Sequence, residues 1–503
     1  MKAKDKNVKK LLEAYEEISM LGKTKAILSW DLNVNLPDKA ADTRAQQTAY
    51  LTKLITEKWL DEDFRGSLEK ASKNKKKLTV KERAIVRNLN YAGKYYYKIP
   101  KEVIIEFSRA TSKAFIVWQK ARKQDRFKDF LPELKKLIRL NKLMAKHLGY
   151  EDNSYDALLD LYEPNLDSTT CKKIFRKLQP KLTNLIKSVE KKNNDKGMEN
   201  LLGEHISYPE QDQRQVAMYA LRKIGYDLEA GRMDISAHPF TTELGKGDVR
   251  ITNRYKTNDF VESLMVALHE GGHALYEQGI KDEYYDTPLE GGVSLGIHES
   301  QSRFWENQVG RSFEFVKFMT PVLQAFYPEQ LSKTDTEILY RLFNRVKPGL
   351  IRVEADEVTY NLHIILRFEI EDALMNDRLK PEDLPGEWNE KMKKYLGVTP
   401  ETDRDGVLQD VHWSHGPFGY FPTYTLGNLY AAQITHKMAK EIDLDELIGR
   451  GELGTILSWL RGNIHQYASL HWPDDLIKKV TGEKLNPKYF LDYIDSKFSE
   501  IYE

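Results

Sequence analysis

The sequence predicts a mainly α-helical protein. Over most of the chain, apolar residues recur at the three- and four-residue spacing of amphipathic helices, whereas the strict alternation typical of half-buried strands is scarce. Capping residues bound many of these helical stretches. The two signals coincide over residues 7–21, 101–121, 131–148, 169–191 and 212–224.

Length and charge set the broad class of protein. A chain of 503 residues exceeds the usual limit for one hydrophobic core, which favours two or three domains or one large body with two lobes. Lys and Arg number 77 against 76 for Asp and Glu, a net charge of +1. Because such a chain has no global field to attract nucleic acid or an anionic membrane, we expect neither as a partner.

Two further features bear on the cellular location. Cys171 is the only cysteine, which excludes an internal disulfide and fits a reducing, cytoplasmic environment. The first residues lack the apolar segment of a secretory signal, and no apolar run reaches the length of a membrane span. We therefore expect a cytoplasmic protein.

One segment departs from the helical pattern. Residues 235–255 alternate between β-prone residues, such as Val249 and Ile251, and turn formers, such as Gly245 and Gly247. This pattern is typical of a small β-hairpin. The predicted hairpin stands immediately before the segment with the strongest functional motif.

That motif is His269-Glu270-Gly271-Gly272-His273. Asn258 or Asp259 can cap a helix around it, and Gly279 can end the helix. On a helix the two histidines lie one turn apart on the same face, where both imidazoles can bind one divalent ion. The intervening Glu270 can take a proton from a metal-bound water, which is the arrangement of a zinc hydrolase.

The surrounding helix argues against a chance occurrence of the motif. In a chain with 12 histidines, chance alone gives such a pentad with a probability on the order of a few per cent. Gly271 and Gly272 each cost a helix roughly 1 kcal/mol relative to alanine, so we expect another part of the chain to approach that face closely. The histidines lie beside an apolar stripe and not within it, and this stripe consists of Val261, Leu264, Leu268, Gly272 and Leu275.

A catalytic zinc ion usually takes three protein ligands, so a third ligand must lie elsewhere. Metzincins place it six residues after the second histidine, but that position is Gly279, which excludes the class. A second helix is predicted around residues 296–307, and it offers His298, Glu299 and Glu306. Glu299 has the best spacing, yet spacing leaves all three open as ligands or as partners that orient a ligand.

Four further segments offer side chains suited to binding a substrate or stabilising developing charge. Two lie in or near the predicted hairpin, one is predicted as a helix with several carboxylates and an arginine, and one is a loop rich in glycine and proline. In that order they are His238-Pro239-Phe240, Asp248 to Thr252 with Arg250, residues 351–363 with Arg352, and residues 409–424 with His412, Tyr420 and Tyr424.

These motifs, in order along the chain, resemble those of the M32 family of metallocarboxypeptidases, the thermostable carboxypeptidase type. The resemblance covers nearly the whole length and shows no departure at a motif position. Weaker matches are Ser29-Trp30-Asp31 and the segment from Tyr155 to Asp160. The stronger ones are His238-Pro239-Phe240, Asp248-Val249-Arg250-Ile251-Thr252, the pentad, His298-Glu299-Ser300-Gln301, Ile351-Arg352-Val353-Glu354-Ala355-Asp356 and Gly406-Val407-Leu408-Gln409-Asp410-Val411-His412-Trp413.

The resemblance implies a ligand set and a fold. Glu299 becomes the third ligand, beside His269 and His273, of one divalent metal per chain, zinc or cobalt. The implied fold is an almost wholly helical HExxH zincin, similar to neurolysin and angiotensin-converting enzyme. In it, one peptidase domain covering residues 1–503 has two helical lobes that flank a long active-site groove. A homodimer is also implied.

The expected activity is hydrolysis of the C-terminal peptide bond of peptides, with broad specificity. A metal-activated water attacks the carbonyl, with Glu270 as general base and later as acid to the leaving amine. By resemblance to related zincins and by chemical type, we expect His238, His412 and Tyr420 to stabilise the oxyanion.

An enzyme of this kind must recognise the free carboxylate of its substrate, for which a guanidinium is the natural bidentate partner. Arg352 is the first candidate and Arg250 the second, with Tyr424 as a further substrate-binding residue. For both arginines the alternative is a salt bridge to a neighbour such as Asp356 or Asp248.

Two other functions fit the same motifs. An endo-acting metallo-oligopeptidase has the same metal centre in a groove open at both ends, and peptides with amidated C-termini distinguish it. A non-catalytic, metal-stabilised helical peptide-binding protein needs a closed site with four ligands. Glu270 argues against the second, because a structural site has no use for that carboxylate.

Overall fold

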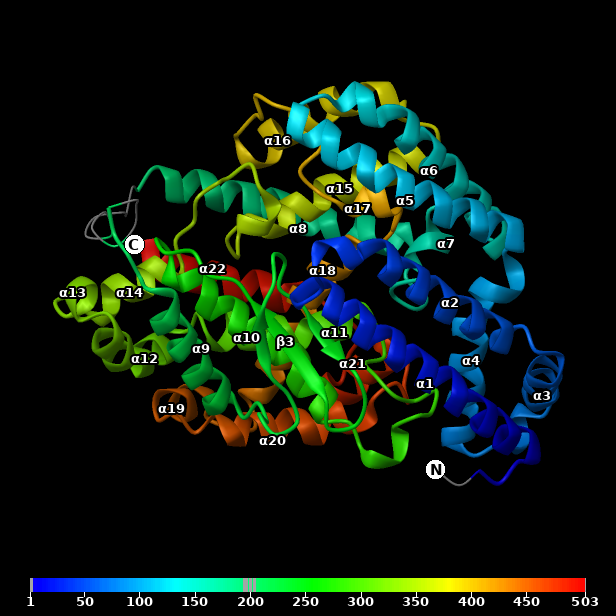
Figure 1. The fold of residues 1–503 in the computed structure, drawn as a ribbon. Coiled ribbons are helices and arrows are strands. Elements are labelled where there is room, and N and C mark those ends of the chain that lie inside the picture. Colours follow the sequence, from blue (N-terminus) through cyan, green and yellow to red (C-terminus); the bar gives the residue numbers. More distant parts are fainter. Residues whose placement is uncertain (1–2, 193–197, 199–200, 202–204, 503) are drawn as a thin grey trace. The chain divides into compact units, whose positions relative to one another are not determined.

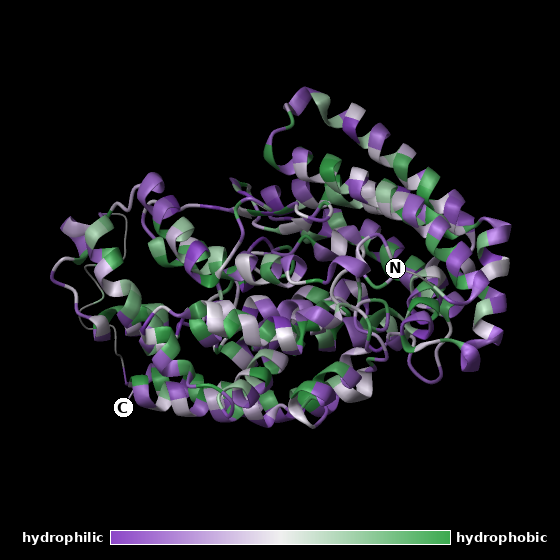
Figure 2. Ribbon diagram, turned by 90° about the horizontal axis from the view of Figure 1, so that it is seen from below, coloured by the Kyte–Doolittle hydropathy of each residue, from purple (hydrophilic) through white to green (hydrophobic). Residues whose placement is uncertain are grey.

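The computed structural model describes residues 3–192, 198, 201 and 205–502. Helices make up most of it (Figure 1), which confirms the mainly α-helical class. Hydrophobic and hydrophilic residues are interleaved along the helical ribbons (Figure 2), as amphipathic helices require. The chain divides into two compact units. Unit 1 comprises Met1–Tyr96, Asp195–Phe343 and Tyr430–Leu485, and unit 2 comprises Tyr97–Asn194, Asn344–Leu429 and Asn486–Glu503.

Unit 1 contains the predicted metal helix and every strand found among the described residues. Its helices are α1 (Lys6–Val34), α2 (Ala41–Trp59), α3 (Glu62–Lys73), α9 (Glu210–Ile224), α10 (Phe260–Gln278), α11 (Leu295–Arg303), α12 (Phe313–Phe326), α13 (Pro328–Leu331), α14 (Thr336–Phe343), α19 (Leu444–Gly449), α20 (Leu453–Asn463) and α21 (Pro473–Thr481). Two helices cross a boundary between the units in the sequence, namely α4 (Val80–Lys98) and α18 (Pro422–Met438).

The regular elements among the described residues of unit 2 are all helical. Its helices are α5 (Lys101–Gln124), α6 (Phe127–Leu148), α7 (Asp156–Leu159), α8 (Ser168–Glu190), α15 (Tyr360–Met375), α16 (Leu384–Leu396), α17 (His412–His415) and α22 (Lys488–Tyr502). Short 3-10 turns in the two units are η1 (Asp38–Ala40), η2 (Lys75–Lys77), η3 (Asp282–Tyr284), η5 (Arg352–Glu354), η6 (Pro381–Asp383) and η7 (His465–Tyr467).

The five helices predicted from periodicity correspond to α1, α5, α6, α8 and α9. Four of them match within a few residues at each end. The exception is α1, which continues past Leu21 to Val34. No proline interrupts it before Pro37, and the indole of Trp30 near its end is buried, so packing extends the helix beyond the stretch that periodicity marks.

The strand-forming segment holds β1 (Met233–Ile235), β2 (Thr241–Glu243) and β3 (Val249–Asn253) in the order β1-β3-β2. Strands β2 and β3 pair antiparallel, with Thr241 opposite Ile251, and β1 pairs parallel with β3. In the connection between β2 and β3, Gly245 and Gly247 have φ values of 139° and 79°, which favour glycine. The sheet packs against α10 (Figure 1), and so it brings Thr241 beside the metal helix.

Helix α10 begins and ends where the sequence predicts. The Asp259 carboxylate accepts hydrogen bonds from the backbone N–H groups of Val261 and Glu262, and Gly279 follows the last helical residue. Every residue of the predicted apolar stripe is buried. Burial extends further round the helix than that stripe and includes the polar residues Glu270 and Glu277, because neighbouring elements cover α10 on several sides.

The glycine pair of α10 marks two close contacts, as predicted. A methyl group on Gly272 would lie 2.5 Å from the carbonyl oxygen of Gln301 and 2.7 Å from Cα of Ser302, both backbone atoms of α11. A methyl group on Gly271 would instead meet the side-chain tips of Leu221 and Ile224, at 2.7 and 2.9 Å. Gly272 therefore lets α11 approach the backbone of α10.

Replacing Gly272 by alanine is expected to destabilise the metal-free protein by about 1–3 kcal/mol, because the backbone of α11 must move away. Gly271→Ala is the matched control, since methyl-bearing side chains can rotate aside and alanine favours the helix. Urea denaturation of both variants measures the difference. Equal stabilities for the two variants would contradict the assigned role of Gly272.

The predicted second helix is present, with one difference in its geometry. Helix α11 starts at Leu295 and is capped by Ser294, whose hydroxyl accepts from the backbone N–H of Ile297. It continues as a π-helical turn, η4 (Phe304–Val309), followed by Gly310. Such turns widen a helix locally and are frequent at functional sites.

The prediction of one helix over residues 351–363 is wrong for its first part. Residues Arg352–Glu354 form only a 3-10 turn, Ala355 is extended, and α15 starts at Tyr360. The reason is Asp356, whose carboxylate accepts from the backbone N–H groups of Val358 and Thr359. The pattern placed this carboxylate on a polar helix face, whereas it caps the turn of residues 357–359 that leads into α15.

No helix among the described residues is both long enough and apolar enough to cross a membrane.

Candidate active site

Three side chains of unit 1 converge on one point. His269 and His273 project from α10 and Glu299 from α11, and one nitrogen or oxygen atom from each lies within 4.8 Å of the others. Oε2 of Glu299 is 3.3 Å from Nε2 of His273 and 3.7 Å from Nε2 of His269. Around a tetrahedral ion with bonds of about 2.1 Å, donor atoms lie about 3.4 Å apart. The donor set therefore fits a single divalent ion.

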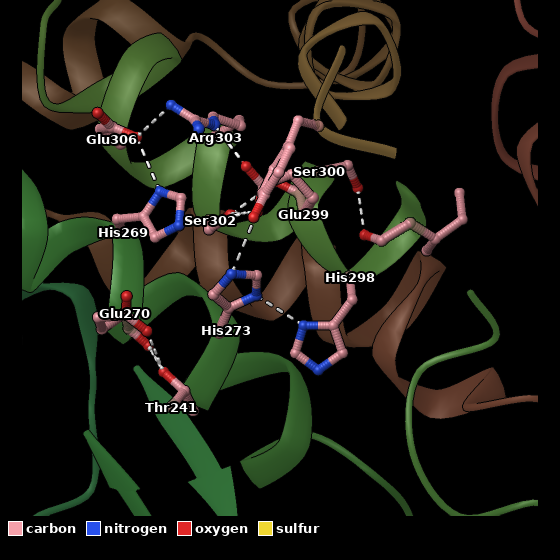
Figure 3. A network of polar contacts seen from close by, with 12 residues as sticks. Thr241, His269, Glu270, His273, His298, Glu299, Ser300, Ser302, Arg303 and Glu306 are labelled. Atoms are coloured by element: carbon pink, nitrogen blue, oxygen red, sulfur yellow. Dashed lines mark hydrogen bonds and ion pairs between the residues drawn. The ribbon is translucent and has the colours of Figure 1, made fainter. Parts of the chain in front are cut away.

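A chain of hydrogen bonds sets the proton positions on His273 (Figure 3). Nε2 of His298 lies 2.7 Å from the Glu277 carboxylate, which accepts, so Nε2 of His298 holds a proton. In the tautomer that matches this bond, Nδ1 of His298 accepts a hydrogen bond from Nδ1 of His273, 2.6 Å away. This leaves the lone pair on Nε2 of His273, the nitrogen that faces Glu299. Burial lowers the pKa of His273 to about 4, which favours the neutral imidazole.

His269 is oriented in the same manner. Its Nδ1 lies 2.8 Å from the Glu306 carboxylate and donates to it, so Nε2 faces Glu299. Burial would lower the pKa of His269, but Glu299 and Glu306 raise it. Burial would raise the pKa of Glu306, but the Arg303 guanidinium and His269 lower it to about 2. The second predicted helix offered three candidates for the third donor, and Glu299 is the one that lies among the converging atoms. Glu306 instead contacts Nδ1 of His269, and His298 contacts Nδ1 of His273.

Arg303 holds two of these carboxylates together (Figure 3). Its Nε lies 2.7 Å from Oε1 of Glu299, and its Nη1 lies 3.1 Å from Oε2 of Glu306. Burial opposes ionisation of Glu299, yet the guanidinium and the two imidazoles hold its pKa well below the usual range. Because Arg303 uses Oε1, the other oxygen of Glu299 remains directed toward the imidazoles.

Glu270 lies on α10 between the two histidines, and its carboxylate is hydrogen-bonded to Thr241 of β2. Its Oε2 accepts a 2.7 Å hydrogen bond from the Thr241 hydroxyl, which also lies 2.9 Å from the Glu270 carbonyl oxygen. Burial raises the pKa of Glu270 above its ordinary value, and His269 and the Thr241 bond offset this only in part. A carboxylate with a raised pKa beside a metal site is suited to accept and return a proton.

Unit 2 contains a second cluster, in which two arginines share one carboxylate. Nε and Nη2 of Arg352 lie 3.0 and 2.9 Å from Oδ1 of Asp410, and Nε of Arg367 lies 2.6 Å from Oδ2. All three side chains are buried. Burial opposes ionisation of Asp410, but the two guanidiniums hold its pKa far below the usual range. The cluster therefore retains one net positive charge.

The loop residues predicted from sequence lie around this cluster. The Arg352 guanidinium lies over the ring of Tyr424, 5.2 Å from its centroid, and Nε2 of His412 is 3.3 Å from the Tyr424 hydroxyl. The ring of Tyr420 lies 5.3 Å from that of Tyr424 and 5.6 Å from that of His412. Burial and the Arg352 charge lower the pKa of His412 to about 3, so its imidazole is neutral near pH 7.

The two remaining candidates lie in or beside the sheet of unit 1. Arg250 on β3 forms a bidentate pair with Asp248, with both N–O distances at 2.7 Å, and stacks over Trp30, 4.6 Å from the ring centroid. This is the salt bridge named as the alternative for Arg250. His238 is exposed in the bend between β1 and β2, where its carbonyl oxygen accepts from the Ser236 hydroxyl.

Sequence reasoning did not single out four residues that the structure places at these clusters. Arg303 stands four residues after Glu299, a spacing that places both on one helix face, so a local signal existed. Thr241 and Arg367 are remote in sequence from the groups they contact. Asp410 lies inside a recognised motif, but nothing local indicates that it pairs with two arginines.

Comparisons with known proteins agree on one family. A family model described as "Carboxypeptidase Taq (M32) metallopeptidase" matches residues 10–498. Thermostable carboxypeptidase 1 of Pyrococcus furiosus is 41% identical over 496 residues, which cover 98% of this chain and 99% of that protein. Thermostable carboxypeptidase 1 of Thermus thermophilus is 41% identical over 504 residues, with 98% of each covered. The crystal structure of an M32 carboxypeptidase from Deinococcus radiodurans R1 is 34% identical, with a TM-score of 0.95 over 99% of this chain and 100% of the other.

Proposed function

The chain belongs to the M32 family of metallopeptidases and is a metal-dependent carboxypeptidase, and we propose that Glu270 is its general base. The observation that supports this proposal best is the convergence of His269, His273 and Glu299, with both imidazoles oriented through Nδ1 and the Glu270 carboxylate on the same helix. In this proposal the three converging side chains are the metal ligands, and the ion is zinc or cobalt.

His269, His273 and Glu299 would hold a divalent ion, which would supply the activation of a water molecule and of the scissile carbonyl. Glu270 accepts the proton of the attacking water and delivers it to the nitrogen of the leaving amino acid. The Thr241 hydroxyl holds the carboxylate in one orientation during both transfers. We assign stabilisation of the developing oxyanion to three side-chain donors, namely His238, His412 and Tyr420.

The residual positive charge of the Arg352, Arg367 and Asp410 cluster supports a role in substrate binding. A buried net charge is costly unless an opposite charge neutralises it. The C-terminal carboxylate of a peptide can supply that opposite charge. Arg352 presents its guanidinium beside Tyr424, so we propose that these two side chains bind the terminal carboxylate. Arg250 remains the second candidate, although Asp248 already occupies one side of its guanidinium.

The larger assembly is proposed on family grounds. We propose that residues 1–503 form one peptidase domain of the helical zincin type, in which two helical lobes flank a long active-site groove. On the same grounds we propose that the enzyme forms a homodimer. We also propose that it accepts peptides with broad specificity. The single cysteine, Cys171, which is buried and free, supports a cytoplasmic location.

Replacing Arg303 by alanine is expected to weaken zinc binding by about 10–100-fold, because Glu299 and Glu306 lose the group that orients them. Competition with a chromogenic chelator measures the dissociation constant. Arg254→Ala is the matched control, since Arg254 pairs with Glu262 at 2.7 Å on the first turn of α10, away from the donor cluster. An unchanged zinc affinity in Arg303→Ala would rule out this role.

The proposed function is tested by giving the metal-loaded protein one peptide as free acid and as C-terminal amide. We expect a ladder of products shortened from the C-terminus with the free acid only, and no products after chelation. Mass spectrometry identifies each product. Internal cleavage of both forms would favour the oligopeptidase alternative, and cleavage of neither form would favour the peptide-binding protein.

A further inference from the structure

Glu371 is a buried carboxylate of unit 2 that has no part in the chemistry proposed above. It lies on α15 and is fully buried. Its carboxylate accepts hydrogen bonds from the Tyr155 hydroxyl at 2.6 Å, from Nε1 of Trp413 at 2.8 Å and from the backbone N–H of Gly419 at 2.9 Å. A buried carboxylate with three donors is costly to assemble, so its position calls for an explanation.

The two oxygens of Glu371 hold two different points of one loop. Oε1 accepts from Trp413, which directly follows His412, and Oε2 accepts from Gly419, which directly precedes Tyr420. Both proposed oxyanion donors of unit 2 are therefore attached to neighbours that Glu371 fixes. The carboxylate group of Glu371 therefore links Trp413 to Gly419.

The same helix also holds the start of this loop. Arg367, four residues before Glu371 and so on the same face of α15, contacts Asp410 at 2.6 Å and Oε1 of Gln409 at 2.9 Å. One face of α15 thus anchors the loop through Gln409, Asp410, Trp413 and Gly419. Between α17 and α18, which begins at Pro422, the loop has no helix or strand, so these anchors help to define its path.

The segment Tyr155 to Asp160 also packs against this loop, at Gly419. Gly419 has a φ of 94°, and a methyl group on it would lie within 2.9 Å of the backbone of Leu158 and Leu159. The ring of Tyr162 packs edge-on against Tyr420, with centroids 5.3 Å apart. Together with the hydrogen bond from the Tyr155 hydroxyl to Glu371, these contacts hold residues 155–162 against the loop.

We propose that Glu371 is a positioning residue for the substrate site: its carboxylate fixes the loop of residues 409–424 so that His412 and Tyr420 keep their places beside Arg352 and Tyr424. The inference rests on the proposed roles of these four residues in substrate binding and catalysis. Glu371 itself touches neither substrate nor metal.

The donors around Glu371 require a carboxylate and not merely a polar group of the same shape. The indole N–H of Trp413 and the backbone N–H of Gly419 can only donate. In Glu371→Gln, the amide NH₂ group must face one of these two donors, which breaks one anchor while the side-chain volume is retained. The substitution therefore tests the anchoring directly.

The experiment compares Glu371→Gln with Glu369→Gln in the full-length, metal-loaded enzyme, with a free-acid peptide as substrate. Glu369 lies on the same helix and also accepts from a tyrosine, Tyr395 at 2.7 Å, but it holds no residue of the loop. We expect kcat/KM to fall by about tenfold to a hundredfold in Glu371→Gln and to remain unchanged in Glu369→Gln. Zinc affinity is expected to stay unchanged in both.

A merely structural role lowers Tm but leaves kcat and KM of the folded enzyme as they were. Unchanged kcat and KM in Glu371→Gln, measured well below its Tm, would overturn the inference. If Glu371→Gln does not fold, Tyr155→Phe removes one donor and is expected to lower kcat/KM by about threefold to tenfold. Unchanged kinetics in that variant would overturn the inference equally.

Arg352→Gln, measured in parallel, separates this inference from the proposed function. A lower kcat/KM in Arg352→Gln with normal kinetics in Glu371→Gln removes the positioning role alone. Normal kinetics in Arg352→Gln removes the substrate role of the cluster, and with it the basis of the inference.

Discussion

Replacing Glu270 by glutamine is expected to lower kcat by about 10²–10⁴-fold while zinc affinity remains within a factor of a few of the parent value. Glutamine keeps the shape of the side chain but cannot accept the proton of the attacking water, and general-base catalysis contributes about this much. Zinc affinity is retained because Glu270 is not among the converging donors. Steady-state kinetics on a free-acid peptide and chelator competition measure the two quantities.

Thr241→Val tests the same assignment of Glu270, with a smaller expected effect. It leaves the carboxylate in place but removes the hydroxyl that lies 2.7 Å from Oε2 of Glu270. We expect kcat to fall by about threefold to tenfold, because one neutral hydrogen bond orients the base. A loss in Thr241→Val as large as that in Glu270→Gln, or loss of zinc in Glu270→Gln, would contradict the assignment of Glu270 as base.

The elements that the sequence predicts well are those in which local signals agree. For α10, the Asp259 cap, the apolar stripe, the glycine pair and Gly279 all indicate one helix, and the structure places each of them as expected. Residues 351–363 show the opposite case. There the helical period continues through Asp356, but the side chain of that residue bonds the backbone and delays the helix until Tyr360.

Spacing along the chain could narrow the third donor to three residues but could not choose among them. His298, Glu299 and Glu306 all lie on or beside one helix, and the choice depends on how closely that helix approaches α10. Gly272 sets this approach, because the backbone of Gln301 and Ser302 lies against it. Contacts such as Thr241 with Glu270 depend on the sheet register and have no local signal.

The same limit applies in unit 2. The sequence singles out Arg352 and the loop of residues 409–424 separately, on chemical grounds. That Asp410 pairs with both Arg352 and Arg367 follows only from the packing of the loop against α15. The net charge of the cluster, on which the proposed binding of a carboxylate rests, is therefore a property of the fold.

Replacing Arg352 by glutamine is expected to lower kcat/KM for a free-acid peptide by about 10²–10⁴-fold. Two hydrogen bonds from a charged donor to the terminal carboxylate are lost, and each contributes about 1.5–3 kcal/mol. The protein should still fold, because Asp410 keeps Arg367 as a partner at 2.6 Å and the cluster becomes neutral. Peptide kinetics and urea denaturation test both statements.

Arg250→Gln is the decisive control for Arg352, because it removes the other guanidinium proposed for the same task. Arg250 is paired with Asp248 and stacked on Trp30, so its loss is expected to reduce stability slightly and to leave the preference for free-acid over amidated peptide intact. If that preference vanishes in Arg250→Gln and survives in Arg352→Gln, the carboxylate site lies at β3. The excess charge of the Asp410 cluster would then serve another anion.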